Sequence, residues 1–366
     1  MKRTGKGIRI GAAMLVTGML LAATGCGRQG DFAKSSTGEE KTRVEESSKT
    51  AQAGTQTESE TQQLREVQYS VWNAYWNLEG VEEQTEELAD HIQNVNFFAA
   101  YFDKDDKVFI PDATKEFYDA NSALYRQKGW NCYLTVVNDQ ILADGSSSLK
   151  STELLYRLLE TEEAYQAHAE ELIALVKESG YEGLEIDYEN IRKDTVLWDY
   201  FMQFTKYLYD RCTQENILLR IVIESNIDTQ SISWVEGPVY CVMCYNLYGT
   251  HSGPGPKADK EFLEEIMEKM RSVPGEVDYA LANGGFDWDE NGGIASLTTE
   301  QAEAEAVQYQ AEVIRDEASG VNHFEYEDEN QDCHEVWYGD NETLQIWMGW
   351  LQSGDNWNYS IWRLGK

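Results

Sequence analysis

The sequence has 366 residues, with 65 Asp and Glu against 30 Lys and Arg, so its formal net charge is −35. This excess of negative charge argues against nucleic acid and anionic membrane surfaces as partners, because phosphate groups are bound through clustered Lys and Arg side chains. Hydrophobic residues make up 42% and aromatic residues 12% of the chain, enough for a sizeable core. The length suits two or three domains or a single α/β barrel, and neutral ligands that stack on aromatic rings, such as sugars, remain compatible.

Residues 1–25 have the pattern of an export signal. Four basic side chains lie in residues 2–9, and Ile10–Ala23 is an apolar run of 14 residues, too short for an ordinary membrane span. Small residues follow directly before Cys26. This order resembles a bacterial lipoprotein signal, in which Cys26 would be lipidated and become the mature N-terminus. A plain secretory peptide is the alternative.

Residues 26–66 are predicted to form a disordered tether. Their only large apolar side chains are Phe32, Val44 and Leu64, which cannot bury enough surface to offset the entropy of ordering the chain. A flexible segment of this length reaches about 35 Å. The protein is therefore expected to be exported and held by its lipid on the outer face of the bacterial cytoplasmic membrane.

From residue 67 onward, short β-rich runs alternate with helical stretches whose apolar residues recur at i, i+3, i+4 and i+7. The predicted strands are Val67–Trp76, Val95–Phe102, Asn131–Val137, Gly183–Glu189, Ile217–Glu224, Val239–Tyr245, Val277–Ala282 and Tyr359–Trp362. Eight repeats of this alternation over about 300 residues predict an α/β fold, a (β/α)8 TIM barrel spanning residues 67–366. Two β-like runs within Val321–Tyr338 predict a small β-hairpin inserted before the last helix.

The fourth predicted strand carries a line of carboxylates. Glu185, Asp187 and Glu189 alternate with apolar residues, so they share the face that points into a barrel, at spacings of about 6.5–7 Å. Like charges in a low-dielectric interior raise at least one pKa. A carboxyl group that keeps its proton near neutral pH is what a glycosidase uses to protonate its leaving group. A solvated acidic face is the alternative, but it does not fit a strand at the centre of the alternation.

Residues 182–189 read Glu-Gly-Leu-Glu-Ile-Asp-Tyr-Glu and resemble the D-G-x-D-x-D-x-E pattern of glycoside hydrolase family 18, the chitinase-like barrels. The resemblance is closest to the bacterial branch of spore- and wall-associated N-acetylglucosaminidases. It implies that Glu189 is the general acid and that Asp187 orients the acetamido group of the substrate. Glu182 and Glu185 stand where the pattern has Asp.

Other predicted strand ends agree with this resemblance. Residues 243–246, Met-Cys-Tyr-Asn, resemble the family's M-x-Y-D, which implies that Tyr245 contacts the acetamido carbonyl and that Asn246 replaces an Asp. Trp362 corresponds to the tryptophan that floors a sugar subsite, and aromatic faces stack well on pyranose rings. Trp76, at the end of the first strand, is a further candidate for the groove, with a core role equally open. The predicted substrate-binding residues are thus Glu185, Asn246, Trp362 and Trp76.

No metal or organic cofactor is expected. The five His residues show no metal-ligand spacing, and Cys241 and Cys244 would face opposite sides of a strand, so they are predicted to be buried free thiols. The glycine-rich segment Gly249–Lys257 lacks the Ser or Thr of a phosphate loop and contains two prolines, so a loop lining the groove is the better interpretation.

The resemblance implies a retaining glycosidase that acts on β-linked N-acetylglucosamine in peptidoglycan or a chitin-like polymer. In this mechanism the acetamido group of the substrate is itself the nucleophile, with Glu189, Asp187 and Tyr245 as the catalytic residues. The alternatives are a glycan-binding barrel of the same family without catalysis, and a structural or solute-binding lipoprotein. The expected partners are the glycan and, through the lipid anchor, the membrane, with the protein as a monomer.

Overall fold

The computed structural model describes residues 67–275 and 277–365. The predicted signal, the tether and Cys26 lie outside these residues. Within the described ranges, no helix is both long enough and apolar enough to cross a membrane.

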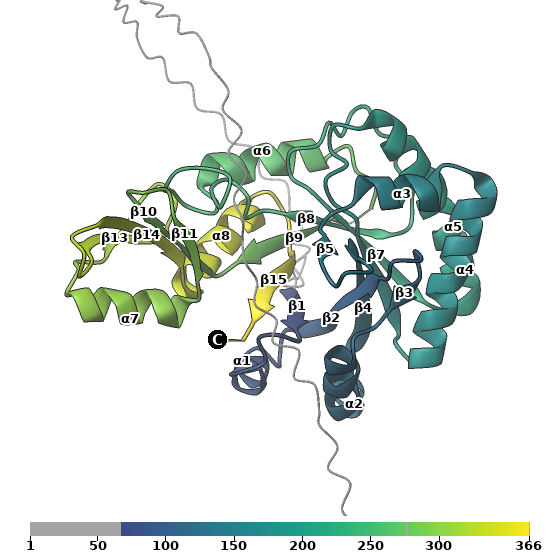
Figure 1. Ribbon diagram of the computed structural model, residues 1–366, viewed down its shortest axis with the longest axis horizontal. Coiled ribbons are helices and arrows are strands. Elements are labelled where there is room, and N and C mark those ends of the chain that lie inside the picture. The colour runs from purple at the N-terminus through teal and green to yellow at the C-terminus, as the bar shows by residue number, and fades with distance from the viewer. Residues whose placement is uncertain (1–66, 276, 366) are drawn as a thin grey trace, which may run out of the picture. The chain divides into compact units, whose positions relative to one another are not determined.

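Eight parallel strands form a closed barrel (Figure 1). They are β1 (Gln68–Ala74), β2 (Ile92–Phe102), β4 (Asn131–Ile141), β6 (Gly183–Asp187), β7 (Leu218–Ile223), β8 (Val239–Met243), β9 (Val277–Ala282) and β15 (Asn358–Leu364). They pair in the order β2-β1-β15-β9-β8-β7-β6-β4, and pairing between β4 and β2 closes the ring. The predicted (β/α)8 barrel is therefore confirmed, with each predicted strand overlapping an observed one.

Helices surround the barrel (Figure 1). They are α1 (Val81–Glu87), α2 (Asp112–Gln127), α3 (Thr152–Leu159), α4 (Glu162–Ser179), α5 (Thr195–Glu215), α6 (Lys260–Met270) and α8 (Asn341–Ser353). Several begin at a residue whose side-chain oxygen accepts a backbone N–H of the first turn, such as Asp194 before α5 and Asp259 before α6. The connection from β7 to β8 contains no helix. Two short strands, β3 (Val108–Phe109) and β5 (Ser147–Ser148), extend β2 and β4.

The strands separate two apolar regions. The larger one lies between the outer faces of the strands and the helices, and the smaller one, inside the barrel, contains Trp72, Val222, Cys241, Met243 and Ala280. Cys241 belongs to the inner region and Cys244 to the outer one, which confirms that they face opposite ways. Both are buried free thiols, as predicted.

A second sheet is inserted between β9 and α8. Its elements are β10 (Gly284–Asp289), β11 (Ile294–Leu297), α7 (Thr299–Tyr309), β12 (Ile314–Arg315), β13 (Asn322–Glu327) and β14 (Cys333–Gly339), and its strands are antiparallel. The predicted hairpin corresponds to β13 and β14, but β10 also pairs along the length of β14, so the insertion is larger than a hairpin. At Gly285 a Cβ atom would lie 1.7 Å from the carbonyl oxygen of Trp337, so only glycine allows this close pairing.

Candidate active site

Strand β6 and the residues directly after it carry three carboxylates, two inside the barrel and one at its mouth. Leu184, Ile186 and Tyr188 belong to the outer apolar region, so Glu185 and Asp187 face inward, and Glu189 follows just beyond the strand. The strand begins at Gly183, where a Cβ atom would lie 2.3 Å from ring atoms of a tyrosine on β4. The glycine therefore allows β6 to lie close to its neighbour, which fixes the position of the carboxylates.

Glu185 is completely buried among protein donors. Its Oε1 accepts hydrogen bonds from Trp72 Nε1 at 2.6 Å and from Thr135 Oγ1 at 2.7 Å, and its Oε2 accepts one from Arg220 Nε at 2.8 Å. Both carboxylate oxygens thus have partners within the barrel. The residue was predicted to bind substrate, but the structure gives it no surface at which a ligand could touch it.

Arg220, on β7, connects Glu185 to a second buried carboxylate. Its Nη1 lies 2.7 Å from Asp278 Oδ2, and its Nη2 donates to Ser360 Oγ at 2.9 Å. Ser70 accepts a further bond from Nη1 at 3.0 Å. This polar network, formed by Glu185, Arg220, Asp278, Ser70 and Ser360, is the floor of the barrel interior beneath the mouth.

Asp187 lies above this floor and is almost without partners. Its side chain is buried, and its Oδ1 has no hydrogen-bond partner among the described residues. Burial raises the pKa of Asp187 well above its usual value, and the negative charges of Glu189 and Glu185 raise it further. The carboxyl group therefore favours its protonated form unless a cationic group approaches it.

Glu189 is held at the mouth by its backbone and by one ion pair. Asn138 Oδ1 accepts the Glu189 backbone N–H at 3.0 Å, and Asn138 Nδ2 donates to the Glu189 carbonyl at 3.1 Å. The Lys150 ammonium lies 2.6 Å from Glu189 Oε2. Burial raises the pKa of Glu189 above its usual value even though Lys150 acts in the opposite direction. A partly exposed carboxyl with a raised pKa is suited to donate a proton.

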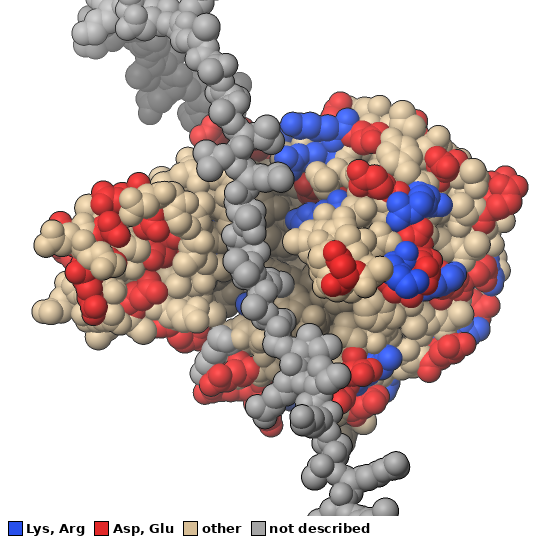
Figure 2. All heavy atoms as spheres, in the orientation of Figure 1, with Lys and Arg blue, Asp and Glu red and all other residues tan. Residues whose placement is uncertain are grey.

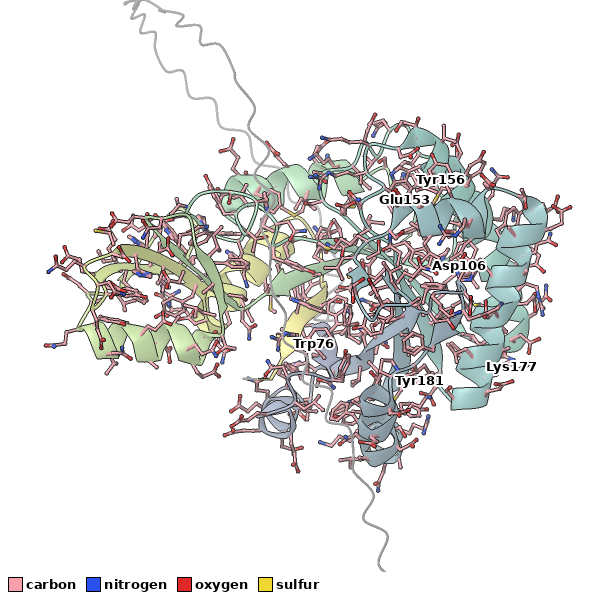
Figure 3. All side chains as sticks on the ribbon, in the orientation of Figure 1. Trp76, Asp106, Glu153, Tyr156, Lys177 and Tyr181 are labelled. Carbon is pink, nitrogen blue, oxygen red and sulfur yellow. The ribbon has the colours of Figure 1, made fainter. Side chains whose placement is uncertain are left out.

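Aromatic side chains border these carboxylates. The Trp362 ring lies 4.9 Å from the ring of Phe98, which in turn lies 5.6 Å from that of Trp76. Trp76, labelled in Figure 3, is 43% exposed and is available for contact at the end of β1. Trp362 and Tyr245 both pack against the inner apolar region. The predicted aromatic positions therefore converge on the same end of the barrel as Glu189.

Tyr245 and Asn246 differ in their surroundings. Burial raises the pKa of Tyr245 well above its usual value, and the charges of Asp187 and Glu189 add to the shift. Its phenol therefore keeps its proton and can donate a hydrogen bond. Asn246 is exposed, and its Nδ2 approaches Met243 Sδ at 3.5 Å, without contact to the carboxylates.

Three charged residues near the site were not found from the sequence. Lys150 occupies a loop after β4 and is recognisable only in space. Glu224, at the end of β7, accepts the Asn190 backbone N–H at 3.1 Å, and its charge raises the pKa of Glu189. Arg220 did leave a signal, because it is a single charge within the apolar run of residues 217–223.

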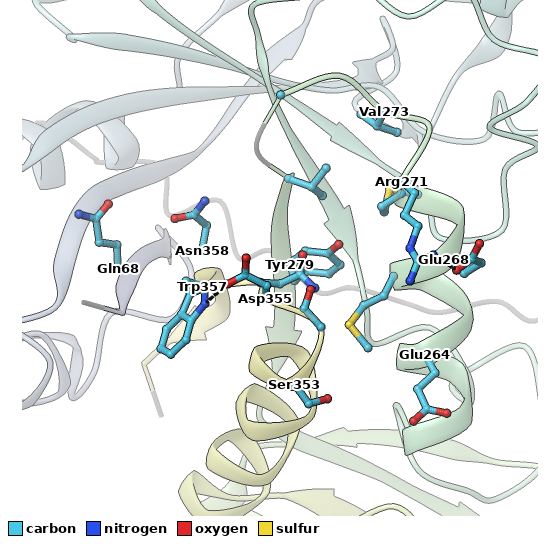
Figure 4. A pocket seen from close by; sticks show the side chains of 16 residues that line it. Gln68, Glu264, Glu268, Arg271, Val273, Tyr279, Ser353, Asp355, Trp357 and Asn358 are labelled. Atoms are coloured by element: carbon cyan, nitrogen blue, oxygen red, sulfur yellow. Dashed lines mark hydrogen bonds and ion pairs between the residues drawn. The ribbon is translucent and has the colours of Figure 1, made fainter. Parts of the chain in front are cut away.

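No cluster of three or more His, Cys, Asp or Glu in residues 67–275 and 277–365 could hold a metal ion. A large cavity of about 790 Å³ lies elsewhere (Figure 4), lined by residues that include Gln68, Val277 and Asn358. These residues begin β1, β9 and β15, so the cavity is at the end of the barrel opposite to Glu189. In TIM barrels chemistry occurs at the carboxyl ends of the strands, which supports the mouth beside Glu189 as the active site.

The structure is a (β/α)8 barrel with carboxyl groups at its mouth. No family model matches the chain. It is 27% identical over 210 residues to the Bacillus subtilis protein YdhD, named as a sporulation-specific glycosylase, and the match covers 53% of this chain and 49% of YdhD. The chain thus spans about half the length of this curated relative.

Solved structures share the fold at lower identity. The Bacillus cereus spore cortex-lytic enzyme SleL superimposes with a TM-score of 0.68 at 17% identity, covering 82% of this chain and 71% of SleL. A class V chitinase from Nicotiana tobaccum, solved in complex with NAG4, gives a TM-score of 0.64 at 11% identity, covering 82% of this chain and 94% of the chitinase. At these identities the likeness establishes the fold.

Proposed function

We propose that the protein is a retaining, substrate-assisted glycoside hydrolase that cleaves β-linked N-acetylglucosamine glycans of peptidoglycan or chitin-like type. The observation that carries the proposal is the pair Asp187 and Glu189, two carboxyl groups with raised pKa values at the mouth of the barrel. The ring of Trp362, at the same end of the barrel, offers a stacking surface for a sugar. The names of the relatives, a glycosylase, a cortex-lytic enzyme and a chitinase, agree with glycan cleavage.

In the first step, Glu189 donates its proton to the glycosidic oxygen as the bond from the anomeric carbon to that oxygen breaks. The acetamido oxygen of the substrate attacks the anomeric carbon and forms a cyclic oxazolinium ion. Asp187 acts in its ionised form, which the approach of positive charge favours. Its unpartnered Oδ1 accepts a hydrogen bond from the acetamido N–H, and its negative charge stabilises the oxazolinium ion as it forms. Tyr245 donates its phenolic proton in a hydrogen bond to the acetamido group.

In the second step, the Glu189 carboxylate takes a proton from water as the water oxygen attacks the anomeric carbon. The ring of the oxazolinium ion opens, the acetamido group is restored, and Glu189 is again protonated. Two displacements at the same carbon retain its configuration. None of these steps uses a cofactor.

We assign Glu185 a supporting role in place of substrate contact. Its hydrogen bonds hold Trp72 and Arg220, and its charge contributes to the raised pKa of Asp187. It thus acts on the substrate only through Asp187. Asn246 remains a proposed contact at the rim of the mouth.

We also propose that the protein works outside the cell as a lipoprotein anchored through Cys26. The support is the order of basic, apolar and small residues before that cysteine. Peptidoglycan would be within reach of a barrel held by a tether of this length.

The test is to incubate the protein separately with chitotetraose, peptidoglycan glycan fragments and cellotetraose, and to identify products by mass spectrometry. The proposal expects cleavage of the N-acetylated glycans and no cleavage of cellotetraose, which lacks the acetamido nucleophile. Cleavage of cellotetraose at a comparable rate would overturn the substrate-assisted mechanism.

A glycan-binding barrel without catalysis is the second candidate. Two observations favour it. The ion pair with Lys150 favours the ionised form of Glu189, the proposed acid, and Asn246 stands where the family pattern has an Asp. Binding of chitotetraose in calorimetry, with no product after prolonged incubation, would establish this alternative.

A further inference from the structure

Two cationic side chains at the mouth of the barrel have no acidic partner among residues 67–275 and 277–365. Lys257, in the loop after β8, and Arg363, near the end of β15, form no ion pair with any residue in the described part of the chain. Elsewhere in the structure, Lys and Arg side chains commonly pair with carboxylates, as Arg157 does with Asp106 and Lys177 with Glu215. In a chain of net charge −35, two cations without carboxylate partners call for a physical reason.

The strand register places the two cations together. Lys257 Nζ donates to the carbonyl oxygen of Asn283 at 2.7 Å. Ala282 and Trp362 are paired across β9 and β15. The residues that follow them are Asn283, directly after the end of β9, and Arg363, on β15. Arg363 therefore lies beside the strand end that holds Lys257, one residue from the tryptophan proposed to stack on a sugar.

The surroundings keep both cations in place but do not neutralise them. Lys257 is half-buried, and its ammonium lies 5.3 Å from the centroid of the Phe286 ring on β10. Burial and the charge of Arg363 lower the pKa of Lys257 to about 7. Burial also lowers the pKa of Arg363. An anion placed between them would relieve both effects, because an opposite charge favours the ionised form of each group.

Figure 2 shows the charged side chains on one face of the molecule. The insertion formed by β10–β14 and α7 displays acidic side chains there. An anionic ligand would be repelled by such a surface unless cations were provided at the point of binding. Lys257 and Arg363 supply two cations of this kind, next to the proposed sugar site.

We propose that Lys257 and Arg363 bind a carboxylate carried by the glycan, beside the sugar that stacks on Trp362. This inference rests on the proposed glycosidase function and narrows its substrate class to an acidic amino-sugar glycan, in preference to a neutral chitin chain. Peptidoglycan offers two such carboxylates, the lactyl ether of alternate sugars and the carboxyl groups of attached peptides. A guanidinium and an ammonium together suit a carboxylate, since both form charge-assisted hydrogen bonds with its oxygens.

The experiment compares Lys257→Met and Arg363→Gln with the unmodified chain on four tetrasaccharides. These are chitotetraose, a peptide-free peptidoglycan tetrasaccharide with lactyl carboxylates, the same compound with its carboxyls converted to amides, and a peptide-bearing form. Matched controls are Lys260→Met and Arg271→Gln, which remove exposed cations from surface pairs on or beside α6. Lys257→Arg and Arg363→Lys keep the positive charge, so they test whether the charge alone restores affinity for the carboxylate glycan.

Each neutral variant is expected to raise KM for the carboxylate glycan by about tenfold, the effect of losing one strong charged hydrogen bond, with little change in kcat. KM for chitotetraose and for the amidated glycan, which offer no carboxylate, should change less than about twofold. The charge-preserving variants should recover most of the affinity, and the controls should match the unmodified chain. An effect seen only with the peptide-bearing form would assign the carboxylate to the peptide.

Equal losses on the acidic and amidated glycans would overturn the anion site, as would equal KM values of the unmodified chain for these two compounds. Calorimetry on the same variants carrying Glu189→Gln in addition measures the dissociation constants for the acidic and amidated glycans without turnover. Cleavage of chitotetraose with no preference for the acidic glycan would refute this inference alone. Absence of cleavage of any N-acetylated glycan would refute the proposed function, and calorimetry would still decide the anion site.

Discussion

At the scale of single residues, the ion pair between Lys150 and Glu189 influences whether the Glu189 carboxyl group is protonated before substrate binds. The ammonium lies 2.6 Å from Glu189 Oε2 and is itself half exposed. Lys150 favours the ionised carboxylate, while burial and the charge of Glu224 favour the protonated form. The proton needed for catalysis is therefore retained more strongly once this ammonium moves away or is removed.

Replacing Lys150 with Met is expected to raise the pKa of Glu189 further. Because the acid must be protonated to act, activity would persist to higher pH, and the alkaline limb of the kcat/KM profile would move upward in pH. Lys193→Met is the matched control, since it removes an exposed cation from the loop after Glu189 without touching the carboxyl group. An alkaline limb that stays in place in Lys150→Met would contradict the role of this ion pair.

Asp187→Asn is expected to lose activity and gain stability. The pKa of Asp187 is raised in the folded protein, so ionisation of this group favours the unfolded state. Wild-type protein thus loses stability as pH rises above the unfolded pKa and through the folded one, whereas the neutral amide does not. The melting temperature of the variant should exceed that of the wild type by at least about 2 °C at pH 8.

The two proteins should have nearly equal melting temperatures close to pH 4, where the wild-type carboxyl is largely protonated when folded. The kcat of Asp187→Asn should fall about 100-fold or more, the usual effect of losing one electrostatic contact to the transition state. A variant that is less stable than wild type at pH 8 would show that ionised Asp187 is not strained in the free protein.

At the scale of secondary-structure elements, Arg220 ties β7 to β6 and β9 through two buried carboxylates. Arg220→Met would leave Glu185 and Asp278 without their counter-charge inside the barrel. Breaking a buried ion pair in this way costs about 3–5 kcal/mol of unfolding free energy. Urea unfolding measures the loss, and Arg271→Gln, an exposed surface change, should alter stability by less than about 0.5 kcal/mol. A loss below about 1 kcal/mol in Arg220→Met would refute the structural role of the network.

The strands of the barrel were predictable because each is a short apolar run bounded by turn residues, and β6 alternates strictly between the two faces. The inserted sheet was harder to predict. Its strand β10 begins with two glycines and pairs with β14, which lies about fifty residues later in the chain, so only the local hairpin β13–β14 left a pattern. Pairing between distant segments has no signature within a window of neighbouring residues.

The same limit applies to the site. Glu189, Asp187 and Tyr245 could be found because strand alternation and motif spacing place them at strand ends. Lys150 could not, because it reaches Glu189 from a loop 39 positions earlier in the chain. The burial of Glu185 was also hidden, since its partners Trp72 and Arg220 come from other strands.

At the scale of the whole molecule, the proposed location depends on residues outside the described part of the chain. Cys26→Ser removes the thiol that lipidation requires, so the variant should leave the membrane fraction or persist as an unprocessed precursor. Cell fractionation followed by mass spectrometry of the mature N-terminus provides the measurement. Unchanged membrane association, with a mature N-terminus at another residue, would contradict the lipoprotein proposal.

The central claim, that Glu189 is the proton donor of a glycosidase, is tested most directly by Glu189→Gln. The amide preserves the shape of the side chain but has no proton to donate as an acid. On chitotetraose, kcat should fall by a factor of about 10²–10⁴, as expected for losing a general acid. The dissociation constant, measured by calorimetry, should change little. Turnover equal to that of the unmodified protein would contradict the account.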